Sequence, residues 1–278
     1  MMNKYPGGNS APDYPMVSVG VPTYNRPNGL RRTLECITTQ SYRNLEIIVS
    51  DNASPGDETG AVVREFMSRD TRIKYIRQDR NIGVIPNFQY VLKMATGEYF
   101  MWAADDDEWD PVFIEFCQSN IGDSGSIMTA FEVKNRVRGQ LDRVELPRLT
   151  GNPHNRADIR EFVRQTKPSM FYGLHRRKLL SFFLDLDAFD WMDCYVCLRL
   201  IWQTGYKCRN DVCLYTAGVD AEKYVVKPFS GNRLKPMRYV VYSLRYAVQA
   251  RDFVTLARHL SILLVPYMKY FRPKSASG

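Results

Sequence analysis

The residues best suited to chemistry are three consecutive aspartates, Asp105, Asp106 and Asp107, in the stretch EYFMWAADDDEWDP. Adjacent carboxylates repel one another unless water or a cation lies among them. Hard divalent ions such as Mg²⁺ and Mn²⁺ bind carboxylate oxygens and commonly bridge them to the phosphates of a substrate. Taken alone, the triplet therefore fits two interpretations equally, a metal-diphosphate site or a solvated acidic turn.

The residues before the triplet predict the element that positions it. Residues 99–104 form a short apolar and aromatic run, which is typical of a buried strand. Similar runs occupy 16–22, 45–50 and 73–76, and helical patterns lie between them at 28–42, 56–70 and 86–95. Strand and helix thus alternate through the first 110 residues, which predicts an α/β fold whose mainly parallel sheet has helices on both faces.

Polar residues follow each of these four strands, namely Tyr24-Asn25-Arg26, Asp51-Asn52, Asn81 and the aspartate triplet. The carboxyl ends of parallel strands share one edge of the sheet, where ligands bind, so we expect these clusters to converge. No glycine-rich dinucleotide motif or P-loop follows any strand, which argues against a dinucleotide oxidoreductase and against a P-loop enzyme.

The second half is less periodic. Strand patterns lie at 126–134, 169–174 and 208–215, and helical patterns lie at 111–119, 157–165 and 190–203. Residues 136–156 are polar and contain Pro147, Gly151 and Pro153, so we expect a loop there. We therefore divide the chain into a disordered lead-in (1–15), a catalytic domain (16–222) and a C-terminal helical extension (223–278).

Charge is distributed unevenly along the chain. Residues 223–278 carry eleven Lys and Arg against one acid, Asp252, for a net charge of +10, whereas residues 1–222 carry −2. Leucines and tyrosines recur at helical spacing in this basic tail, which favours an amphipathic anchor on an anionic membrane over a solvated helical hairpin. Nucleic acid is the rival partner for a basic segment, but no binding motif accompanies it.

The cysteine content and the absence of a long apolar segment indicate where in the cell the protein is expected. Six scattered cysteines without a secretory signal before them suit a reducing compartment, and no window offers some 18 uninterrupted apolar residues. We expect a cytoplasmic protein, peripheral at the cytoplasmic face of a membrane.

Two long stretches resemble the family 2 glycosyltransferases, which have the GT-A fold. They are VSVGVPTYNRPNGLRRTLECITTQSYRNLEIIVSDNASPGDET and RNIGVIPNFQYVLKMATGEYFMWAADDDEW. The resemblance runs from Val17 to about Asp110 and continues more weakly to about Gly205. It implies a nucleotide-diphosphate sugar donor, usually a UDP-sugar, and divides the catalytic domain into a nucleotide-binding half (16–110) and an acceptor half (111–222).

The resemblance also assigns donor residues. Pro22, Tyr24 and Arg26 match the loop that contacts the nucleobase and ribose, Asp51 matches the acid that binds the base, and Asn81 lies near the nucleotide. The triplet matches the DxD motif, whose acids hold the ribose and a Mn²⁺ or Mg²⁺ ion on the diphosphate. Its register is ambiguous: Asp105 with Asp107 is a literal DxD, whereas alignment from Trp109 places Asp105 on the ribose and Asp106 on the metal.

Sugar transfer needs a base that takes the proton of the acceptor hydroxyl. None of the three histidines lies near a strong motif, so a carboxylate is favoured. The segment FDWMDCYVCLRL resembles the family's "ED…R" segment and places Asp193 at the base position, with Asp190 as the alternative. Met192 stands where the family often has Glu, and either aspartate could instead cap a helix.

The resemblance implies a metal-dependent, inverting glycosyltransferase, and together with the basic tail it predicts that one sugar is added to a lipid-linked or surface-polysaccharide acceptor. The QxxRW signature of processive members is missing. The alternatives are a sugar-phosphate nucleotidyltransferase and a non-catalytic nucleotide-sugar-binding module. The first is disfavoured because the loop PTYNRPNGL lacks the Gly-rich, Lys/Arg-containing pattern that holds a triphosphate.

Overall fold

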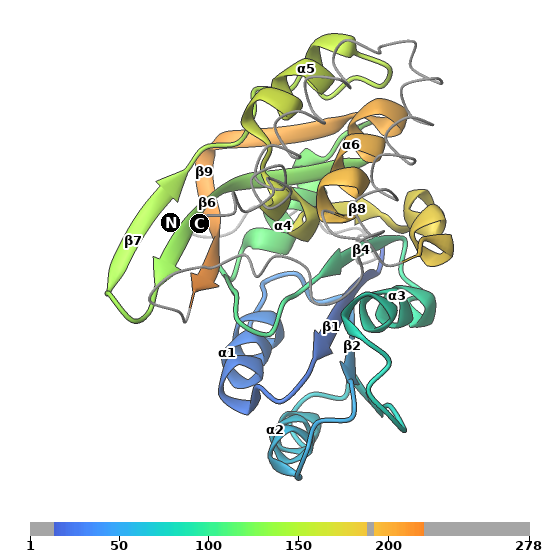
Figure 1. The fold of residues 1–278 in the computed structure, drawn as a ribbon, viewed down its shortest axis with the longest axis vertical. Coiled ribbons are helices and arrows are strands. Elements are labelled where there is room, and N and C mark those ends of the chain that lie inside the picture. The colour runs from blue at the N-terminus through green and yellow to red at the C-terminus, as the bar shows by residue number, and fades with distance from the viewer. Residues whose placement is uncertain (1–13, 188–191, 220–278) are drawn as a thin grey trace, which may run out of the picture.

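The computed structural model describes residues 14–187 and 192–219. The strands of this part form one sheet, and the helices pack around it (Figure 1). The strands are β1 (Val17–Thr23), β2 (Leu45–Asp51), β3 (Ile73–Arg77), β4 (Tyr99–Trp102), β5 (Glu108–Trp109), β6 (Ser126–Asn135), β7 (Gln140–Val144), β8 (Leu174–Arg176) and β9 (Tyr206–Val219). The α-helices are α1 (Pro27–Thr38), α2 (Glu58–Met67), α3 (Val84–Met94), α4 (Phe113–Asn120), α5 (Arg156–Gln165) and α6 (Met192–Thr204). Two 3₁₀ helices, η1 (Pro168–Tyr172) and η2 (Arg177–Asp185), follow α5. The expected lead-in through residue 13, Asp190 and the basic tail lie outside the described residues.

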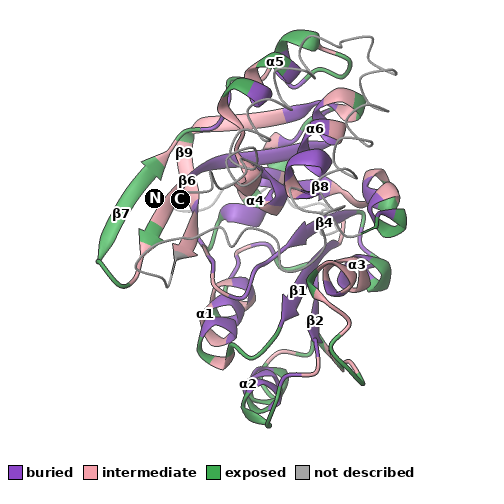
Figure 2. Cartoon of the chain, viewed as in Figure 1, coloured by how far each residue is buried: buried purple, intermediate pink, exposed green. Residues whose placement is uncertain are grey.

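The first half of the sheet is parallel, as the alternation of strands and helices predicts. Strand β1 pairs with β2 on one side and β4 on the other, and β3 pairs with β2, all in parallel. Helices α1 and α2 contact each other, whereas α3 covers the other face against β1 and β2 (Figure 1). Every residue of β1, β2 and β4 is buried, as covered strands require (Figure 2).

The second half extends the sheet with mixed directions in the order β4-β8-β6-β9-β5. Strand β8 is antiparallel to both β4 and β6, whereas β6 and β9 form a long parallel ladder. Strand β5 is antiparallel to β9, with Trp109 opposite Tyr215. This last pairing matters for the site, because it brings the loop that follows β4 beside the end of β9.

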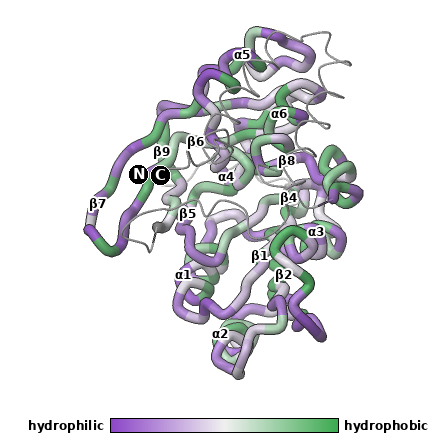
Figure 3. Tube along the Cα trace, in the orientation of Figure 1, coloured by the Kyte–Doolittle hydropathy of each residue, from purple (hydrophilic) through white to green (hydrophobic). Residues whose placement is uncertain are grey.

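Two expectations for this half are wrong. The expected loop at 136–156 contains strand β7, which pairs with β6 and is mainly hydrophilic, with Leu141 and Val144 as its apolar residues (Figure 3). Asn135 makes the turn, because its side-chain oxygen accepts from the backbone N–H groups of Val137 and Arg138. The expected strand at 169–174 is the 3₁₀ helix η1, whose first residue is Pro168, a position where the missing N–H is not needed.

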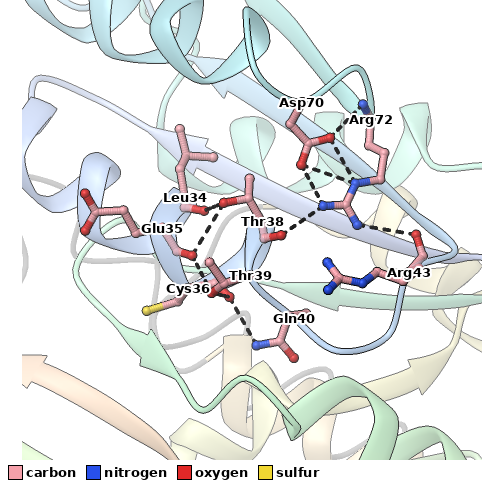
Figure 4. A network of polar contacts seen from close by, with 9 residues as sticks. All are labelled: Leu34, Glu35, Cys36, Thr38, Thr39, Gln40, Arg43, Asp70 and Arg72. Atoms are coloured by element: carbon pink, nitrogen blue, oxygen red, sulfur yellow. Dashed lines mark hydrogen bonds and ion pairs between the residues drawn. The ribbon is translucent and has the colours of Figure 1, made fainter.

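Polar contacts fix the end of α1 to the elements around it (Figure 4). The Arg72 guanidinium donates to the carbonyls of Thr38 and Arg43 and forms an ion pair with Asp70. Gln40 is fully buried and donates to the Cys36 and Asp110 carbonyls, while its oxygen accepts from Ile114 N–H. Helix α1 is thereby held against both the α2–β3 turn and the start of α4.

Aromatic side chains fill the core at the end of β4. Trp102 stacks on Phe171 of η1, with ring centroids 4.1 Å apart and planes 14° apart, and its indole N–H donates to the Phe88 carbonyl of α3 at 3.0 Å. The strand is thus fixed from both halves of the molecule just before the chain enters the triplet.

Candidate active site

Asp105 joins the loop after β4 to the loop after β1. Its Oδ2 accepts a hydrogen bond from Thr23 Oγ1 at 2.8 Å, and its carboxylate also accepts from the backbone N–H of Tyr24. Burial raises the pKa of Asp105, while these hydrogen bonds and Arg26 oppose the rise. Asn25 turns the chain between these contacts with a positive φ of 53°, a conformation that Asn tolerates better than most residues.

Asp106 is the most accessible member of the triplet. Its Oδ2 lies 2.5 Å from Nη1 of Arg26, and the same Nη1 lies 3.2 Å from Asp105 Oδ1. Two carboxylates therefore share one cationic group at the edge of the sheet. The arrangement shows that both can face a single positive charge, which is what a bound divalent ion would require.

Asp107 points to a different environment. Its two oxygens accept hydrogen bonds from the Tyr215 hydroxyl and from Gly218 N–H, the latter at 2.9 Å. Burial and the neighbouring Asp106 charge raise the pKa of Asp107 to about 7. These contacts tie the acidic loop to the end of β9, so the geometry favours Asp106 over Asp107 as a metal ligand.

The second strand contributes Asp51, which is fully buried. Its oxygens accept from Ser54 N–H at 2.8 Å and from the Tyr75 hydroxyl at 3.0 Å. The next residue, Asn52, donates to the Asn81 side chain at 3.0 Å and accepts from Ile82 N–H. The clusters after β2 and β3 therefore meet, as the strand-end rule predicts.

The remaining residues predicted to bind the donor lie at the same edge. Pro22 is buried within β1 opposite Ser50 of β2. Tyr24 presents its side chain to solvent, with 45% of the residue exposed, so its ring is available to a ligand. Asn87 is buried and exchanges two hydrogen bonds with Ser50, which assigns it to the scaffold.

The candidate base Asp193 lies in the first turn of helix α6. It is partly buried, burial raises its pKa, and its Oδ1 accepts from the N–H of Cys194 at 2.7 Å. A raised pKa strengthens a carboxylate as a proton acceptor. Asp190, the alternative, lies outside the described residues. Arg176 donates to the carbonyl of Gly122 after α4, and Arg177 donates to the carbonyl of Gly97 before β4, so both belong to the scaffold.

The chemistry of the acids fits a magnesium or manganese ion. Asp105 and Asp106 offer hard oxygen donors around one cation position. Within residues 14–187 and 192–219, no group of three or more His, Cys, Asp or Glu could hold a metal. A divalent ion at this edge would therefore complete its shell with phosphate oxygens or water, as Mg²⁺ does in many phosphate-binding sites.

Several residues that shape the site are not among those that the sequence predicts. Thr33 of α1 donates to the carbonyls of Ala104 and Asp107, at 2.9 and 3.1 Å, and so fixes both ends of the triplet. Tyr215 lies 108 residues from its partner Asp107. Helical spacing marks Thr33 as inward-facing, but the contact of Tyr215 depends on the β5–β9 pairing, for which the sequence carries no signal.

The sequence was compared with known proteins. A family model described as "Glycosyl transferase family 2" matches residues 18–183. The GalNAc(5)-diNAcBac-PP-undecaprenol beta-1,3-glucosyltransferase of Campylobacter jejuni is 41% identical over 95 residues, 34% of this chain and 30% of the relative. The putative colanic acid biosynthesis glycosyl transferase WcaA of Escherichia coli is 33% identical over 99 residues, 35% of this chain and 34% of the relative. The matched regions thus span about a third of these relatives.

Solved structures share the fold. S. aureus TarS 1–349 in complex with UDP-GlcNAc superimposes with a TM-score of 0.72 and 16% identity, over 93% of this chain and 76% of that one. The mannosyltransferase PcManGT from Pyrobaculum calidifontis, in complex with GDP-Man and Mn²⁺, gives 0.54 and 18%, over 94% and 78%. No helix among the described residues is long and apolar enough to cross a membrane. Since the family model covers more than half of the chain and the expected fold is present, the chain belongs to glycosyl transferase family 2 and has the GT-A fold.

Proposed function

We propose that this protein transfers one sugar from a nucleotide-diphosphate donor, with UDP as the favoured nucleotide, to a hydroxyl group of a lipid-linked or surface-polysaccharide acceptor. The observation that carries the proposal is the convergence of Asp105 and Asp106 on one cationic group at the carboxyl edge of the parallel strands. The family membership and the UDP-GlcNAc of the TarS complex support the donor class. The name of the Campylobacter relative, which contains PP-undecaprenol, supports a lipid-linked acceptor.

In this proposal the two halves of residues 16–222 have separate functions, donor binding and acceptor binding. Residues 16–110 hold the donor, with Pro22, Tyr24, Arg26, Asp51 and Asn81 around the nucleotide and Asp105 on the ribose. Asp106 holds the divalent ion, which when bound neutralises charge on the departing diphosphate. Asp107 fixes the loop through Tyr215 and Gly218.

Residues 111–222 bind the acceptor and supply the base. Asp193 takes the proton of the attacking hydroxyl, which its raised pKa favours. A single displacement of this kind inverts the anomeric centre, and one sugar is added in each encounter. The basic tail at 223–278 holds the protein peripherally on an anionic membrane at the cytoplasmic face, where a lipid-linked acceptor is presented.

The donor is tested by incubating the protein with Mn²⁺ and a panel of UDP-, GDP- and dTDP-sugars. We expect binding, detected as a rise in melting temperature, and slow donor hydrolysis with a UDP-sugar. Absence of binding, hydrolysis and transfer across the whole panel would contradict the proposal.

The base is tested by Asp193→Asn. We expect turnover to fall by about 100-fold or more, while the dissociation constants of UDP and Mn²⁺ stay within about twofold. Asp211→Asn is the control, because Asp211 is an exposed carboxylate on β9 that pairs with Arg209, two residues away. Unchanged turnover in Asp193→Asn would show that Asp193 is not the base and would leave Asp190 as the alternative.

A further inference from the structure

Arg26, in the loop after β1, links two of the three aspartates. Its Nη1 bonds to both Asp105 and Asp106, and 53% of its side chain is exposed, against 12% and 27% for the two acids. The guanidinium therefore closes the carboxylate pair from the solvent side. It lies within hydrogen-bond distance of both carboxylates, so a cation that binds Asp106 on this side would have to displace it.

A positive charge is required at this point for a physical reason. Asp105, Asp106 and Asp107 are consecutive, and both oxygens of Asp107 are already committed to Tyr215 and Gly218. The remaining two carboxylates would repel each other across a partly desolvated turn. Arg26 cannot lose its proton, so it supplies a permanent counter-charge in the absence of other ions.

The ion pairs of Arg26 with Asp105 and Asp106 can also be broken readily. Half-exposed ion pairs are weak, because water solvates the separated charges well. Among the residues that the structure describes, the guanidinium hydrogen-bonds through Nη1 alone, which leaves Nε and Nη2 for another anion. A guanidinium binds a phosphate well with two parallel N–H groups.

We propose that Arg26 is a resident counter-cation that occupies the metal position in the donor-free protein and moves to the diphosphate when metal and donor bind. The inference rests on the proposed function and gives Arg26 a role beyond a contact to the nucleotide. Metal alone must displace Arg26 from Asp106, so it binds weakly. A diphosphate that draws Arg26 away removes this competition, and the coupling is reciprocal.

The test is calorimetric titration of Mn²⁺ into full-length, metal-free protein with and without saturating UDP. In Arg26→Gln, Mn²⁺ without UDP is expected to bind about tenfold more tightly than in the wild type, since its competitor is gone. The factor by which UDP strengthens Mn²⁺ binding is expected to shrink by a similar ratio. Arg26→Lys, which keeps the charge, should stay close to the wild type in the absence of UDP.

Arg31→Gln is the matched control. Arg31 is also a partly exposed arginine of the α1 region, but it pairs with Glu65 of α2 at 2.5 Å. Its substitution should leave both Mn²⁺ constants unchanged. Melting curves of all variants verify that they are folded, which is expected because the Arg26 side chain is half-exposed.

The outcomes separate the inference from the proposed function. If the wild type binds Mn²⁺ and UDP together but Arg26→Gln binds Mn²⁺ alone no more tightly than the wild type, the counter-cation role is wrong and the metal site stands. If neither protein binds Mn²⁺ even with UDP, the metal-dependent function and the inference both fail. Tighter binding in Arg26→Lys equal to that in Arg26→Gln would also overturn the inference, because charge would then not be the cause.

Discussion

Three identical side chains in a row acquire three different environments in this protein. Asp105 bonds to the loop after β1, Asp106 faces a cation near solvent, and Asp107 is buried against Tyr215. The strand-end rule predicts that the triplet meets the clusters after β1 to β3, and the structure confirms it for Asp105 and Arg26. The strand-end rule cannot distinguish the environment of Asp106 from that of Asp107, because the partners of Asp107 lie on strand β9, about 110 residues later.

Glu46 is a buried carboxylate at the opposite end of the sheet, and it holds the scaffold together. It accepts from Ser18 of β1, from Thr96 and Gly97 before β4, and from Lys74 of β3. Burial alone would raise its pKa, but the hydrogen bonds from Ser18, Thr96 and Lys74 outweigh it and lower the pKa to about 2. The charged form is therefore the stabilising one.

We expect Glu46→Gln to lower the free energy of unfolding by about 2 kcal/mol at pH 7. A carboxylate with a depressed pKa contributes stability above its unfolded pKa, near 4.5, and loses it as the pH falls toward 2. The difference in the free energy of unfolding between the variant and the wild type should therefore disappear over this pH range. Urea unfolding at pH 7, 4 and 3 measures it, with the exposed Glu35→Gln as control. A gap that is the same at every pH would contradict the assignment.

At the scale of elements, helix α1 is the support on which the acidic loop rests. Its buried face presents Thr33, which bonds to two carbonyls of the triplet region, and Gly29, which lies directly against Asp105. A Cβ atom at position 29 would be only 2.1 Å from the Asp105 carbonyl oxygen. No real atom pair tolerates that distance, so any side chain at this position must displace the loop backbone.

Gly29→Ala is expected to separate stability from binding. Alanine favours a helix by about 1 kcal/mol over glycine, which offsets part of the steric cost, so the fold should persist. The displaced loop should weaken UDP–Mn²⁺ binding by about tenfold or more, measured by calorimetry. Gly60→Ala in α2 is the control, because the nearest atoms that its Cβ would meet are ends of side chains rather than backbone: Arg64 Nη1 at 2.9 Å, and Asp57 Oδ1 and the Tyr75 hydroxyl at 3.2 Å. Equal binding in both variants would show that the loop adapts.

Elements were predictable where hydrophobic periodicity is strong and contacts are local. The four parallel strands and their helices follow from short apolar runs separated by helical patterns. Strand β7 escaped prediction because it is a largely exposed edge strand without a run of apolar residues, stabilised mainly by its pairing to β6. The aromatic residues of η1 resemble a strand in sequence, yet Phe171 is buried by stacking on Trp102 in a 3₁₀ turn. In both segments, tertiary contacts rather than the local sequence pattern determine the secondary structure.

The whole molecule separates charge between its body and its tail. The body through residue 222 carries −2, whereas the tail from Lys223 carries +10. Within the body, carboxylates near the triplet pair with basic side chains, as Glu108 does with Lys134 and Arg136. The excess positive charge therefore resides in the tail, which is the part of the sequence suited to an anionic surface.

A full-length variant with Arg245, Arg251, Arg258 and Lys269 changed to glutamine tests the tail at this scale. Each basic residue near an anionic bilayer contributes about 1 kcal/mol, so the four changes should weaken binding to phosphatidylserine vesicles by at least about 100-fold. Vesicle co-sedimentation measures the effect, and the wild type should itself dissociate at high salt, since charge attraction is screened within a Debye length. Binding of UDP and Mn²⁺ should be unchanged, because no residue of the donor site is altered. Equal sedimentation of both proteins with anionic vesicles, or equal binding of the wild type to neutral vesicles, would show that charge does not hold this protein on membranes.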